Sequence, residues 1–382
     1  MILADTLLDA LGHAGFGLIA GVPCSYLTPL INAASASQEV RYVGAANEGE
    51  AIAIACGAEL AGLRSMAFFQ NSGLGNAVNP LTSLAAPFRK PILIMTTWRG
   101  EPGEPPDEPQ HAMMGDITPK LLELMGIGWE RLPEDETDLA PALERADAHM
   151  SSSGLSYAFI VPKGGVGGDN PAPASEGLRA ANPSALEPRD LLSGEPLEPD
   201  LALAAVQRAA GPEHAVLATT GFTGRALYAL EDRPSQFYMV GSMGCISSVG
   251  LGIAKAQPQR RVIVLDGDGA MLMRLGAAAT LGFERPPNLL HVLLDNGVHD
   301  STGAQPTVSN VTDLAAVARS CGYPDVLRVS SAAELEDAIR TPRRELGFVH
   351  VRTAPRADRK LPRPTQTAQE LADRFSRWLA DD

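Results

Sequence analysis

The feature that most constrains this chain is a strand, helix and strand unit in its second half. An apolar, largely β-branched strand over residues 261–265 runs into the turn Gly267-Asp268-Gly269. A helix, expected at Ala270–Gly282, leads to a second apolar strand, Leu289–Leu294, which is soon followed by Asn296. Because parallel neighbours end at the same edge of a sheet, we expect Asp268 and Asn296 to lie side by side at the edge where α/β proteins bind ligands.

The residues at this edge suit a magnesium ion that is bound to a diphosphate. The Asp268 carboxylate and the Asn296 amide supply the hard oxygen ligands that magnesium prefers beside phosphate oxygens. Gly267 and Gly269 permit a tight turn whose bare amides can face an anion. An Asp-Gly turn in an ordinary α/β protein remains open as the alternative. A nicotinamide-binding fingerprint fits less well, because Leu272 is bulky where a small residue is needed and the acidic residue lies inside the turn.

The composition is that of a globular protein with room for two domains. The chain has 382 residues, of which 45% are hydrophobic and 20% are charged. Its formal net charge of −14 argues against nucleic acid or an anionic membrane as the main partner, so an anionic substrate would need local donors. We expect neither a signal peptide nor a membrane span at the N-terminus. The cysteines show no paired or metal-type spacing, which is typical of a reducing cytoplasm; they are Cys24, Cys56, Cys245 and Cys321.

The order of expected elements predicts two doubly wound parallel-sheet α/β domains joined by a linker. Strands and helices alternate through residues 1–165. The strands expected there are Gly17–Gly21, Arg41–Ala45, Met66–Gln70, Pro91–Thr97 and Tyr157–Val161. Residues 166–198 are rich in Gly, Pro, Ser and Glu without an apolar period, so we expect a linker there. The alternation resumes in residues 199–382 and ends with an amphipathic helix over Thr367–Leu379.

Three further segments carry candidate functional residues. The loop Arg99–Gln110 is too rich in proline for a helix and is expected to be either a lid over a site or a solvated surface loop. Asn47-Glu48 opens a small-residue helix directly after an expected strand, although the helix dipole alone also stabilises a glutamate there. Met243 in Gly241-Ser242-Met243-Gly244 precedes another small-residue helix, and a methionine at such a place also fills gaps in ordinary cores.

Together these motifs resemble those of the thiamine diphosphate-dependent decarboxylase superfamily, and within it the chain is most similar to the phosphonopyruvate decarboxylase family. The likeness covers nearly the whole chain except the linker. The stretches that carry it are Gly21–Leu27, Gln70–Asn76, Asp107–His111, Thr219–Gly221, Gly241–Gly244, Gly267–Gly269 and Asp295–Gly303. The resemblance implies a pyrimidine-binding (Pyr) domain followed by a diphosphate-binding (PP) domain, without the middle domain of larger relatives.

The resemblance also implies roles for individual residues. Glu48 would bond to the aminopyrimidine ring of thiamine diphosphate, and Met243 would support the bent cofactor while the Gly241 carbonyl accepts from its amino group. The implied magnesium ligands are Asp268, Asn296 and the carbonyl of Val298. The remaining implied cofactor-binding residues are Thr219, Thr220, Gly221, Ser242, Gly267 and Gly269. Because the cofactor spans two domains contributed by different chains in this family, a homodimer or higher homo-oligomer is expected.

The implied reaction is the magnesium-dependent, non-oxidative decarboxylation of 3-phosphonopyruvate, a small anionic 2-keto acid, to 2-phosphonoacetaldehyde and carbon dioxide, in phosphonate antibiotic biosynthesis. A sulfopyruvate or other 2-keto acid decarboxylase is the first alternative. Sulfopyruvate decarboxylases usually consist of two separate subunits, so the fused chain favours the phosphonate. A non-catalytic cofactor-binding assembly protein is the alternative of another class, and the joint presence of Glu48, Asp268 and Asn296 argues against it.

His111, at the end of the acidic, proline-rich loop, is the candidate for proton transfer or carboxylate placement, because an imidazole titrates near working pH. An exposed loop histidine without such a role remains open. Further candidates for substrate contacts are Ser25, Asn71, Ser72 and His299, with Arg99 and Lys163 as candidate sources of positive charge. Two positions depart from the relatives. Thr302 stands where larger decarboxylases place a glutamate, and Cys245 stands where a histidine is expected in this subgroup.

Overall fold

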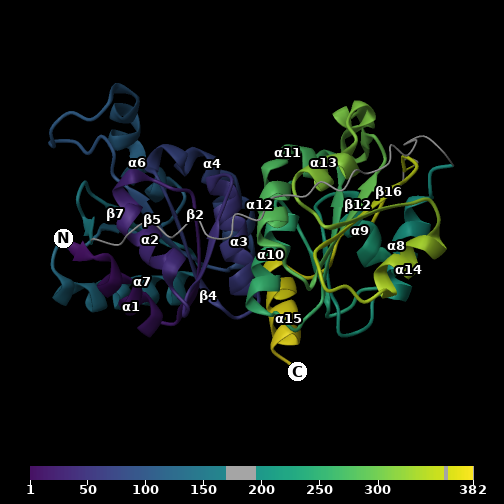
Figure 1. Ribbon diagram of the computed structural model, residues 1–382, viewed down its shortest axis with the longest axis horizontal. Helices are drawn as coiled ribbons and strands as arrows, with labels where there is room; N and C mark the ends of the chain where they lie inside the picture. Colours follow the sequence, from purple (N-terminus) through teal and green to yellow (C-terminus); the bar gives the residue numbers. More distant parts are fainter. Residues whose placement is uncertain (169–194, 357–359, 382) are drawn as a thin grey trace. The chain divides into compact units, whose positions relative to one another are not determined.

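The computed structural model describes residues 1–168, 195–356 and 360–381, and it separates the chain into two compact units, Met1–Leu178 and Arg179–Asp382. Each unit contains one six-stranded, all-parallel sheet with helices packed against it (Figure 1). Numbered along the chain within each unit, the strands follow the same spatial order, 2-1-3-4-6-5. The two units therefore repeat one doubly wound topology, in which ligands bind beyond the carboxyl ends of the strands.

In the first unit the strand order is β3-β2-β4-β5-β7-β6. The strands are β2 (Phe16–Gly21), β3 (Arg41–Gly44), β4 (Arg64–Phe69), β5 (Leu93–Thr97), β6 (Gly128–Arg131) and β7 (Tyr157–Val161). A short parallel pair joins β1 (Ile2–Leu3) to β8 (Val166–Gly167). The helices are α1 (Ala4–His13), α2 (Thr28–Ala36), α3 (Glu48–Leu60), α4 (Leu74–Pro80), α5 (Ala86–Phe88), α6 (Ala112–Leu124) and α7 (Leu139–Ser153). Short helical turns lie at η1 (Ser25–Leu27), η2 (Asn71–Gly73), η3 (Leu81–Ala85), η4 (Pro109–His111) and η5 (Glu136–Asp138).

Helix α3 is the central element of this unit. Its small and apolar residues are buried around nearly the whole circumference, since the helix contacts β2, β4 and α4. The Asn47 side chain caps it by accepting a hydrogen bond from the Glu50 amide at 3.0 Å, so the helix begins immediately after β3 with Glu48 in its first turn. A separate apolar core joins helices α1, α2 and α7 to the sheet and includes Leu7, Leu30 and Leu143.

In the second unit the strand order is β10-β9-β11-β12-β16-β15. These strands are β9 (Ala215–Ala218), β10 (Gln236–Tyr238), β11 (Val262–Gly267), β12 (Leu289–Asp295), β15 (Asp325–Val329) and β16 (Gly347–Arg352). A small antiparallel pair joins β13 (Val298–His299) to β14 (Gln305–Pro306). The helices are α8 (Pro199–Ala209), α9 (Phe222–Leu230), α10 (Ile246–Ala256), α11 (Asp268–Met273), α12 (Gly276–Glu284), α13 (Leu314–Ser320), α14 (Ala332–Arg340) and α15 (Ala368–Ala380). Two helical turns lie at η6 (Asp300–Thr302) and η7 (Val308–Val311).

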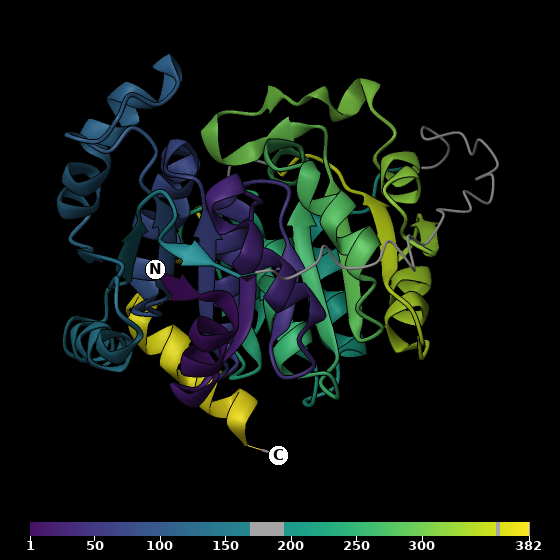
Figure 2. The same ribbon diagram turned by 60° about the vertical axis from the view of Figure 1, so that its left-hand side comes forward.

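The strands β11, β12 and β16 form the middle of the second sheet and are mostly apolar and almost entirely buried, as parallel strands covered on both faces should be. Figure 2 shows β12, in green, beside β16, in yellow. One apolar core joins α8, α9 and α14 to the sheet through residues such as Val206, Leu227 and Ile339. Helix α10 contacts β9, β11 and β12. The sheet is thus packed against helices, and its carboxyl ends carry the loops that follow.

The structure departs from the expected elements in a few places. The helix expected at Ala270–Gly282 is two helices, α11 and α12, because Arg274 leaves the helical region with φ −136° and ψ 54°. The expected linker, residues 166–198, begins with the paired strand β8 and includes Leu197, which bridges to Thr353, while residues 169–194 lie outside the described part. No helix was expected from the sequence at α6 or α7, and no strand was expected at β6. Among the described residues, no helix combines the length and apolar character needed to cross a bilayer.

Candidate active site

A cavity of about 330 Å³ lies at the carboxyl edge of the second sheet. Strands β11 and β12 pair in register up to Gly267 and Leu294, which brings the segments that follow them, with Asp268 and Asn296, to the same edge. Of the residues expected to bind cofactor, metal or substrate, those lining this cavity are Thr219, Thr220, Gly221, Met243, Gly267, Asp268, Gly269, Asn296, Val298 and His299. Gly241 and Ser242 are not among the lining residues. Segments that lie far apart in the sequence therefore converge on one cavity.

Asp268 is held by hydroxyl groups that the sequence did not single out. Its Oδ2 atom accepts hydrogen bonds from the Thr307 hydroxyl and, at 2.9 Å, from the Ser309 hydroxyl. Ser309 also lies 3.0 Å from Asp295 Oδ1, so one hydroxyl links the two carboxylates. Burial, with Asp295 close by, raises the pKa of Asp268 even though the two hydroxyls oppose the shift. A divalent cation would favour the ionised form, because a nearby positive charge lowers the pKa of a carboxyl group.

Asp295 belongs to the supporting network. Burial alone would raise the pKa of Asp295. His350, whose Nε2 lies 2.9 Å from Asp295 Oδ2, together with hydrogen bonds from Ser309 and Gly297, outweighs burial and leaves that pKa below its ordinary value. Asp295 Oδ1 also accepts from the amide of Gly297 at 3.1 Å, which fixes the turn after β12. This arrangement orients the loop that carries Asn296 and Val298.

The oxygen atoms that the cavity offers as metal ligands fit a hard cation. The Asn296 amide donates to Asp300 Oδ2 at 2.6 Å, and its Oδ1 accepts from the Val298 amide at 3.0 Å. The other oxygen of Asp300, Oδ1, is buried and has no hydrogen-bond partner among the described residues. The described residues contain no cluster of three His, Cys, Asp or Glu side chains that could hold a metal. A metal in this cavity would therefore use amide and carbonyl oxygens beside carboxylate, which suits magnesium.

Two glycines are needed for the shape of the cavity. A Cβ atom on Gly269 would lie 2.6 Å from His299 Cε1 and 3.4 Å from Met243 Cε, so these three residues approach one another only because position 269 lacks a side chain. Gly221 has φ 94° and ψ −143°, a conformation that favours glycine, and it turns β9 directly into the first turn of α9. Ser242 adopts a left-handed φ of 52°, which is uncommon for a residue with a side chain and occurs at functional sites.

Glu48 lies at the carboxyl edge of the first sheet. Its Oε2 accepts a hydrogen bond from the Asn76 side chain at 2.8 Å. A Cβ on Gly73 would lie 2.1 Å from Glu48 Oε1, so glycine at position 73 is required for the carboxylate to occupy its place. Glu50, by contrast, is fully buried, and its carboxylate accepts from the Ala46 amide at 2.7 Å. The two glutamates therefore differ in surroundings, and Glu48 is the partly exposed one.

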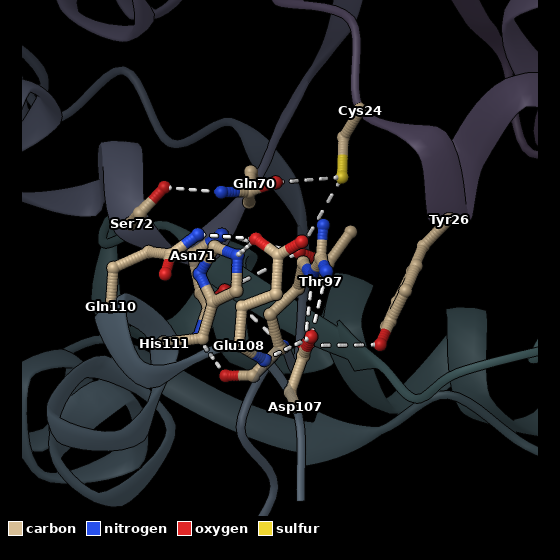
Figure 3. Close-up of polar contacts among 11 residues, drawn as sticks. Cys24, Tyr26, Gln70, Asn71, Ser72, Thr97, Asp107, Glu108, Gln110 and His111 are labelled. Atoms are coloured by element: carbon tan, nitrogen blue, oxygen red, sulfur yellow. Dashed lines mark hydrogen bonds and ion pairs between the residues drawn. The ribbon is translucent and has the colours of Figure 1, made fainter.

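A polar cluster surrounds the end of β5 in the first unit (Figure 3). Asn71 is at its centre and is fully buried. Its side-chain nitrogen donates to the Arg99 carbonyl at 3.0 Å and to Thr118 Oγ1 at 3.2 Å. Its side-chain oxygen accepts from the Arg99 amide at 3.2 Å and from Thr97 Oγ1 at 3.4 Å. All four hydrogen-bonding positions of the amide are used, so Asn71 positions the loop after β5 and has no group left for a substrate.

The loop Arg99–Gln110 is fastened by an ion pair. Arg99 Nε and Nη2 donate to the two oxygens of Asp107 at 2.8 and 2.7 Å, and the Tyr26 hydroxyl donates to the same carboxylate at 3.3 Å. The hydrogen bonds from Arg99 hold the pKa of Asp107 well below its usual range, although burial opposes the shift. Arg99 is therefore neutralised by its own loop. Apart from this ion pair most residues of the loop are exposed, so the lid and the solvated surface loop both stay open.

His111 follows this loop and is buried. Its Nε2 lies 4.0 Å from Glu108 Oε2, and its Nδ1 has no hydrogen-bond partner among the described residues. Figure 3 shows His111 next to Glu108 and Gln110. The alternative of an exposed loop histidine is wrong. Ser25, Ser72 and Lys163 are exposed, and the structure gives them no contact that distinguishes a substrate-binding role.

Comparison with known proteins agrees with this fold and site. The family model described as "Thiamine pyrophosphate enzyme, N-terminal TPP binding domain" matches residues 1–120, and "Thiamine pyrophosphate enzyme, C-terminal TPP binding domain" matches residues 219–352. Thiamine pyrophosphate and thiamine diphosphate are the same compound. A protein of Mycobacterium smegmatis, described as a "putative thiamin diphosphate-dependent enzyme", shares the fold at a TM-score of 0.67 and 14% identity, covering 93% of this chain and 100% of that one. A 4-hydroxybenzoylformate decarboxylase from Rhodococcus jostii RHA1 shares the fold at a TM-score of 0.70 and 14% identity, covering 93% of this chain and 99% of that one. Fold and site thus define a thiamine diphosphate-dependent enzyme.

Full-length relatives narrow the family. A phosphonopyruvate decarboxylase of Streptomyces viridochromogenes is 46% identical over 99% of this chain and 95% of its own length. A second phosphonopyruvate decarboxylase, from Streptomyces hygroscopicus, is 42% identical over 100% of this chain and 95% of its own length. The chain belongs to the phosphonopyruvate decarboxylase family of thiamine diphosphate-dependent decarboxylases.

One argument from the sequence needs correction. A single-chain sulfopyruvate decarboxylase of Methanosarcina acetivorans is 30% identical over 98% of this chain and 97% of its own length. Fusion of the two domains therefore does not distinguish a phosphonate from a sulfonate substrate.

Proposed function

We propose that this enzyme decarboxylates 3-phosphonopyruvate to 2-phosphonoacetaldehyde and carbon dioxide, with thiamine diphosphate and magnesium, in the biosynthesis of phosphonate natural products. The observation that carries the proposal is the full-length identity of 46% and 42% to phosphonopyruvate decarboxylases, against 30% to the sulfopyruvate enzyme. The cavity at the edge of the second sheet supports it, because its donors suit a metal-bound diphosphate.

The second unit would hold the charged end of the cofactor. Asp268, Asn296 and the carbonyl of Val298 would bind magnesium, while Asp300 and the hydroxyls of the 307–309 segment keep these ligands oriented. Thr219, Thr220, Gly221, Gly267 and Gly269 would surround the diphosphate, and Gly241, Ser242 and Met243 would support the ring system. When bound, thiamine diphosphate supplies an electron sink for the electron pair released as carbon dioxide leaves.

The first unit would supply the groups that move protons. Glu48, restrained by Asn76, would bond to the aminopyrimidine ring through its carboxylate. His111 has one unpaired ring nitrogen among the described contacts, so it can donate or accept a proton at that atom, and the fastened loop keeps the imidazole in place. Ser25, Ser72 and His299 remain candidates for substrate contacts.

The proposed assembly is a homodimer or a higher homo-oligomer, with active sites formed between chains, and the proposed location is the cytoplasm. In support, each unit carries one half of the cofactor chemistry, Glu48 in the first and Asp268 in the second.

The direct test is carbon dioxide release from phosphonopyruvate, sulfopyruvate and pyruvate by the purified protein with thiamine diphosphate and magnesium. We expect kcat/KM for phosphonopyruvate to exceed the others by a factor of about 100 or more, since a site built for one charged group discriminates strongly. A preference for sulfopyruvate would instead establish the second candidate, which the single-chain relative favours. Calorimetry that detects no uptake of thiamine diphosphate would contradict both.

A further inference from the structure

A second cavity, of about 300 Å³, adjoins the cofactor cavity in the second unit. The two cavities share Thr220, Gly221 and Arg225, so they meet at the turn between β9 and α9. The other residues that line the second cavity are Gly224, Tyr238, Met239, Val240, Arg363, Pro364, Gln366 and Leu371. The segment before α15 and the first turns of α9 therefore line a space next to the proposed cofactor site.

The charge of the second cavity is positive. Among the described residues, its ionisable lining groups are Arg225, Arg363 and the neutral phenol of Tyr238, and no aspartate or glutamate lines it. Neither arginine forms an ion pair within the described part of the chain, whereas Arg356 and Arg374 nearby along the sequence are paired with Asp200 and Asp232. Arg225 is also the only arginine or lysine among the described residues that line the cofactor cavity. Two guanidinium groups without a carboxylate favour an anion with several acceptor oxygens.

Arg363 is itself exposed, and the segment that carries it is held against α9. Thr365, two residues after Arg363, donates its backbone amide to the hydroxyl of Tyr228 on α9 at 3.4 Å. Helix α15 then begins with a capping box between Thr367 and Glu370.

Helix α15 is itself anchored to the sheet. The Arg374 guanidinium donates to both oxygens of Asp232, at 2.6 and 2.8 Å, and the Tyr238 hydroxyl donates to the same carboxylate at 2.9 Å. Leu371, which lines the cavity, is buried in the apolar core. The second cavity is therefore lined partly by packed elements of the fold and partly by the segment that precedes α15.

The sequence predicted other sources of positive charge for the substrate. Arg99, in the first unit, already donates to both oxygens of Asp107, and Lys163 lines neither cavity. The chain as a whole carries a net charge of −14, so a small dianion requires a local group of cations. Arg225 and Arg363 supply such a group beside the cofactor cavity.

We propose that Arg225 and Arg363 bind the phosphonate group of the substrate in this second cavity. The proposal rests on the proposed decarboxylase function and names the residues that recognise the anionic group at C3. Guanidinium groups donate in pairs to tetrahedral oxyanions, and a dianionic phosphonate gains more from two cations than a monoanionic sulfonate does. The two arginines thus act in substrate selection, while the metal and diphosphate are held by the adjoining cavity.

The test uses phosphonoacetate, which carries a phosphonate and a carboxylate but has no keto group and cannot be decarboxylated. Its dissociation constant is measured by calorimetry on the full-length protein loaded with thiamine diphosphate and magnesium, for the wild type and for Arg225→Met and Arg363→Met. We expect the dissociation constant to rise about 10- to 100-fold in each variant, because each loses a charge-assisted hydrogen-bonding group. Arg363→Lys should lose less, since it keeps the charge. Arg344→Met is the matched control, because Arg344 is an exposed arginine of the same unit that lines neither cavity.

Two further measurements show whether the arginines act on the substrate or on the cofactor. The dissociation constant of thiamine diphosphate should stay within about twofold of wild type in the Arg363 variant, and KM for phosphonopyruvate should rise more than kcat falls. The proposal is overturned if phosphonoacetate binds both variants as tightly as the wild type, or if Arg225→Met weakens the cofactor and leaves phosphonoacetate binding unchanged. A wild type that binds phosphonoacetate through these arginines but releases no carbon dioxide from phosphonopyruvate would contradict the proposed reaction and not the anion site.

Discussion

At the scale of single residues, the proposed metal ligands depend on neighbours that are not ligands themselves. Thr307 and Ser309 both donate to the same oxygen of Asp268, and Ser309 links it to Asp295. These hydroxyls fix the carboxylate rotamer and stabilise its negative charge before a cation arrives. Outer residues of this kind commonly change metal affinity by about 10- to 100-fold when they are removed.

Thr307→Val should therefore weaken the metal site without abolishing it, because Ser309 remains. We expect the magnesium concentration that gives half-maximal uptake of thiamine diphosphate to rise about tenfold, measured by calorimetry at increasing magnesium. Thr312→Val is the control, since the Thr312 hydroxyl donates to the Val308 carbonyl and to no carboxylate among the described residues. Equal magnesium requirements in the two variants would show that Thr307 does not orient Asp268.

Glu48 is the second residue whose role can be isolated. Glu48→Gln keeps the size of the side chain and an oxygen for the hydrogen bond from Asn76, but it removes the ionisable carboxyl group. We expect cofactor affinity to stay near that of the wild type while kcat falls by a factor of about 100 to 10,000, the range for loss of acid–base catalysis. Calorimetry and carbon dioxide release measure the two quantities, with exposed Glu104→Gln as the control. Unchanged turnover in the Glu48 variant would remove Glu48 from the mechanism.

At the scale of elements, a carboxyl group that responds to pH links the last turn of α3 to β4. Glu59 Oε1 accepts from the Ser65 amide at 2.6 Å and from the Ser65 hydroxyl at 3.1 Å. Burial raises the pKa of Glu59 from 4.5 to about 7, against the opposing effect of these hydrogen bonds. The folded protein thus binds a proton at Glu59 more tightly than the unfolded chain does. The resulting stabilisation is complete below the unfolded pKa of 4.5 and is lost as the pH rises through about 7.

Glu59→Gln removes this titration while keeping an acceptor for Ser65. We expect the wild type to lose about 1–3 kcal/mol of unfolding free energy between pH 5 and pH 8 through Glu59, and the variant to lack this part of the decrease. Urea denaturation followed by circular dichroism at both pH values measures the effect. Glu144→Gln, at an exposed position on α7, is the control. If the Glu59 variant keeps the full pH dependence of the wild type, another group is responsible.

At the scale of the whole molecule, the proposed division of labour between chains can be tested by complementation. If Glu48 of one protomer works with Asp268 of its partner, a mixed dimer of Glu48→Gln and Asp268→Asn chains contains one intact site and one doubly altered site. Random pairing makes half of the dimers mixed, so we expect about a quarter of wild-type activity from two inactive variants after unfolding and refolding together. Activity that stays at the level of the separate variants would place both residues of a site in one chain.

Much of this protein could be predicted from local sequence. The turn after β11, the asparagine after β12 and the glutamate after β3 are fixed by strand order, because parallel strands end at a common edge. Asn71 shows where such prediction fails. Its sequence context resembles a binding turn, but its amide is fully used inside the protein, which depends on the packing of α6, with Thr118, against η2. No helix was expected from the sequence at α6, so the hydrogen bond between Asn71 and Thr118 could not be predicted.

The amino-acid sequence by itself determined the doubly wound fold and the side chains at the carboxyl ends of the strands, because apolar strands and glycine turns encode these within short stretches. The tertiary structure decided which distant groups join them: the hydroxyls of Thr307 and Ser309 that donate to Asp268, and Arg363, which lines the same cavity as Arg225. These partners come from segments far along the chain, and burial of the helices between them sets their positions, so no local pattern specifies them.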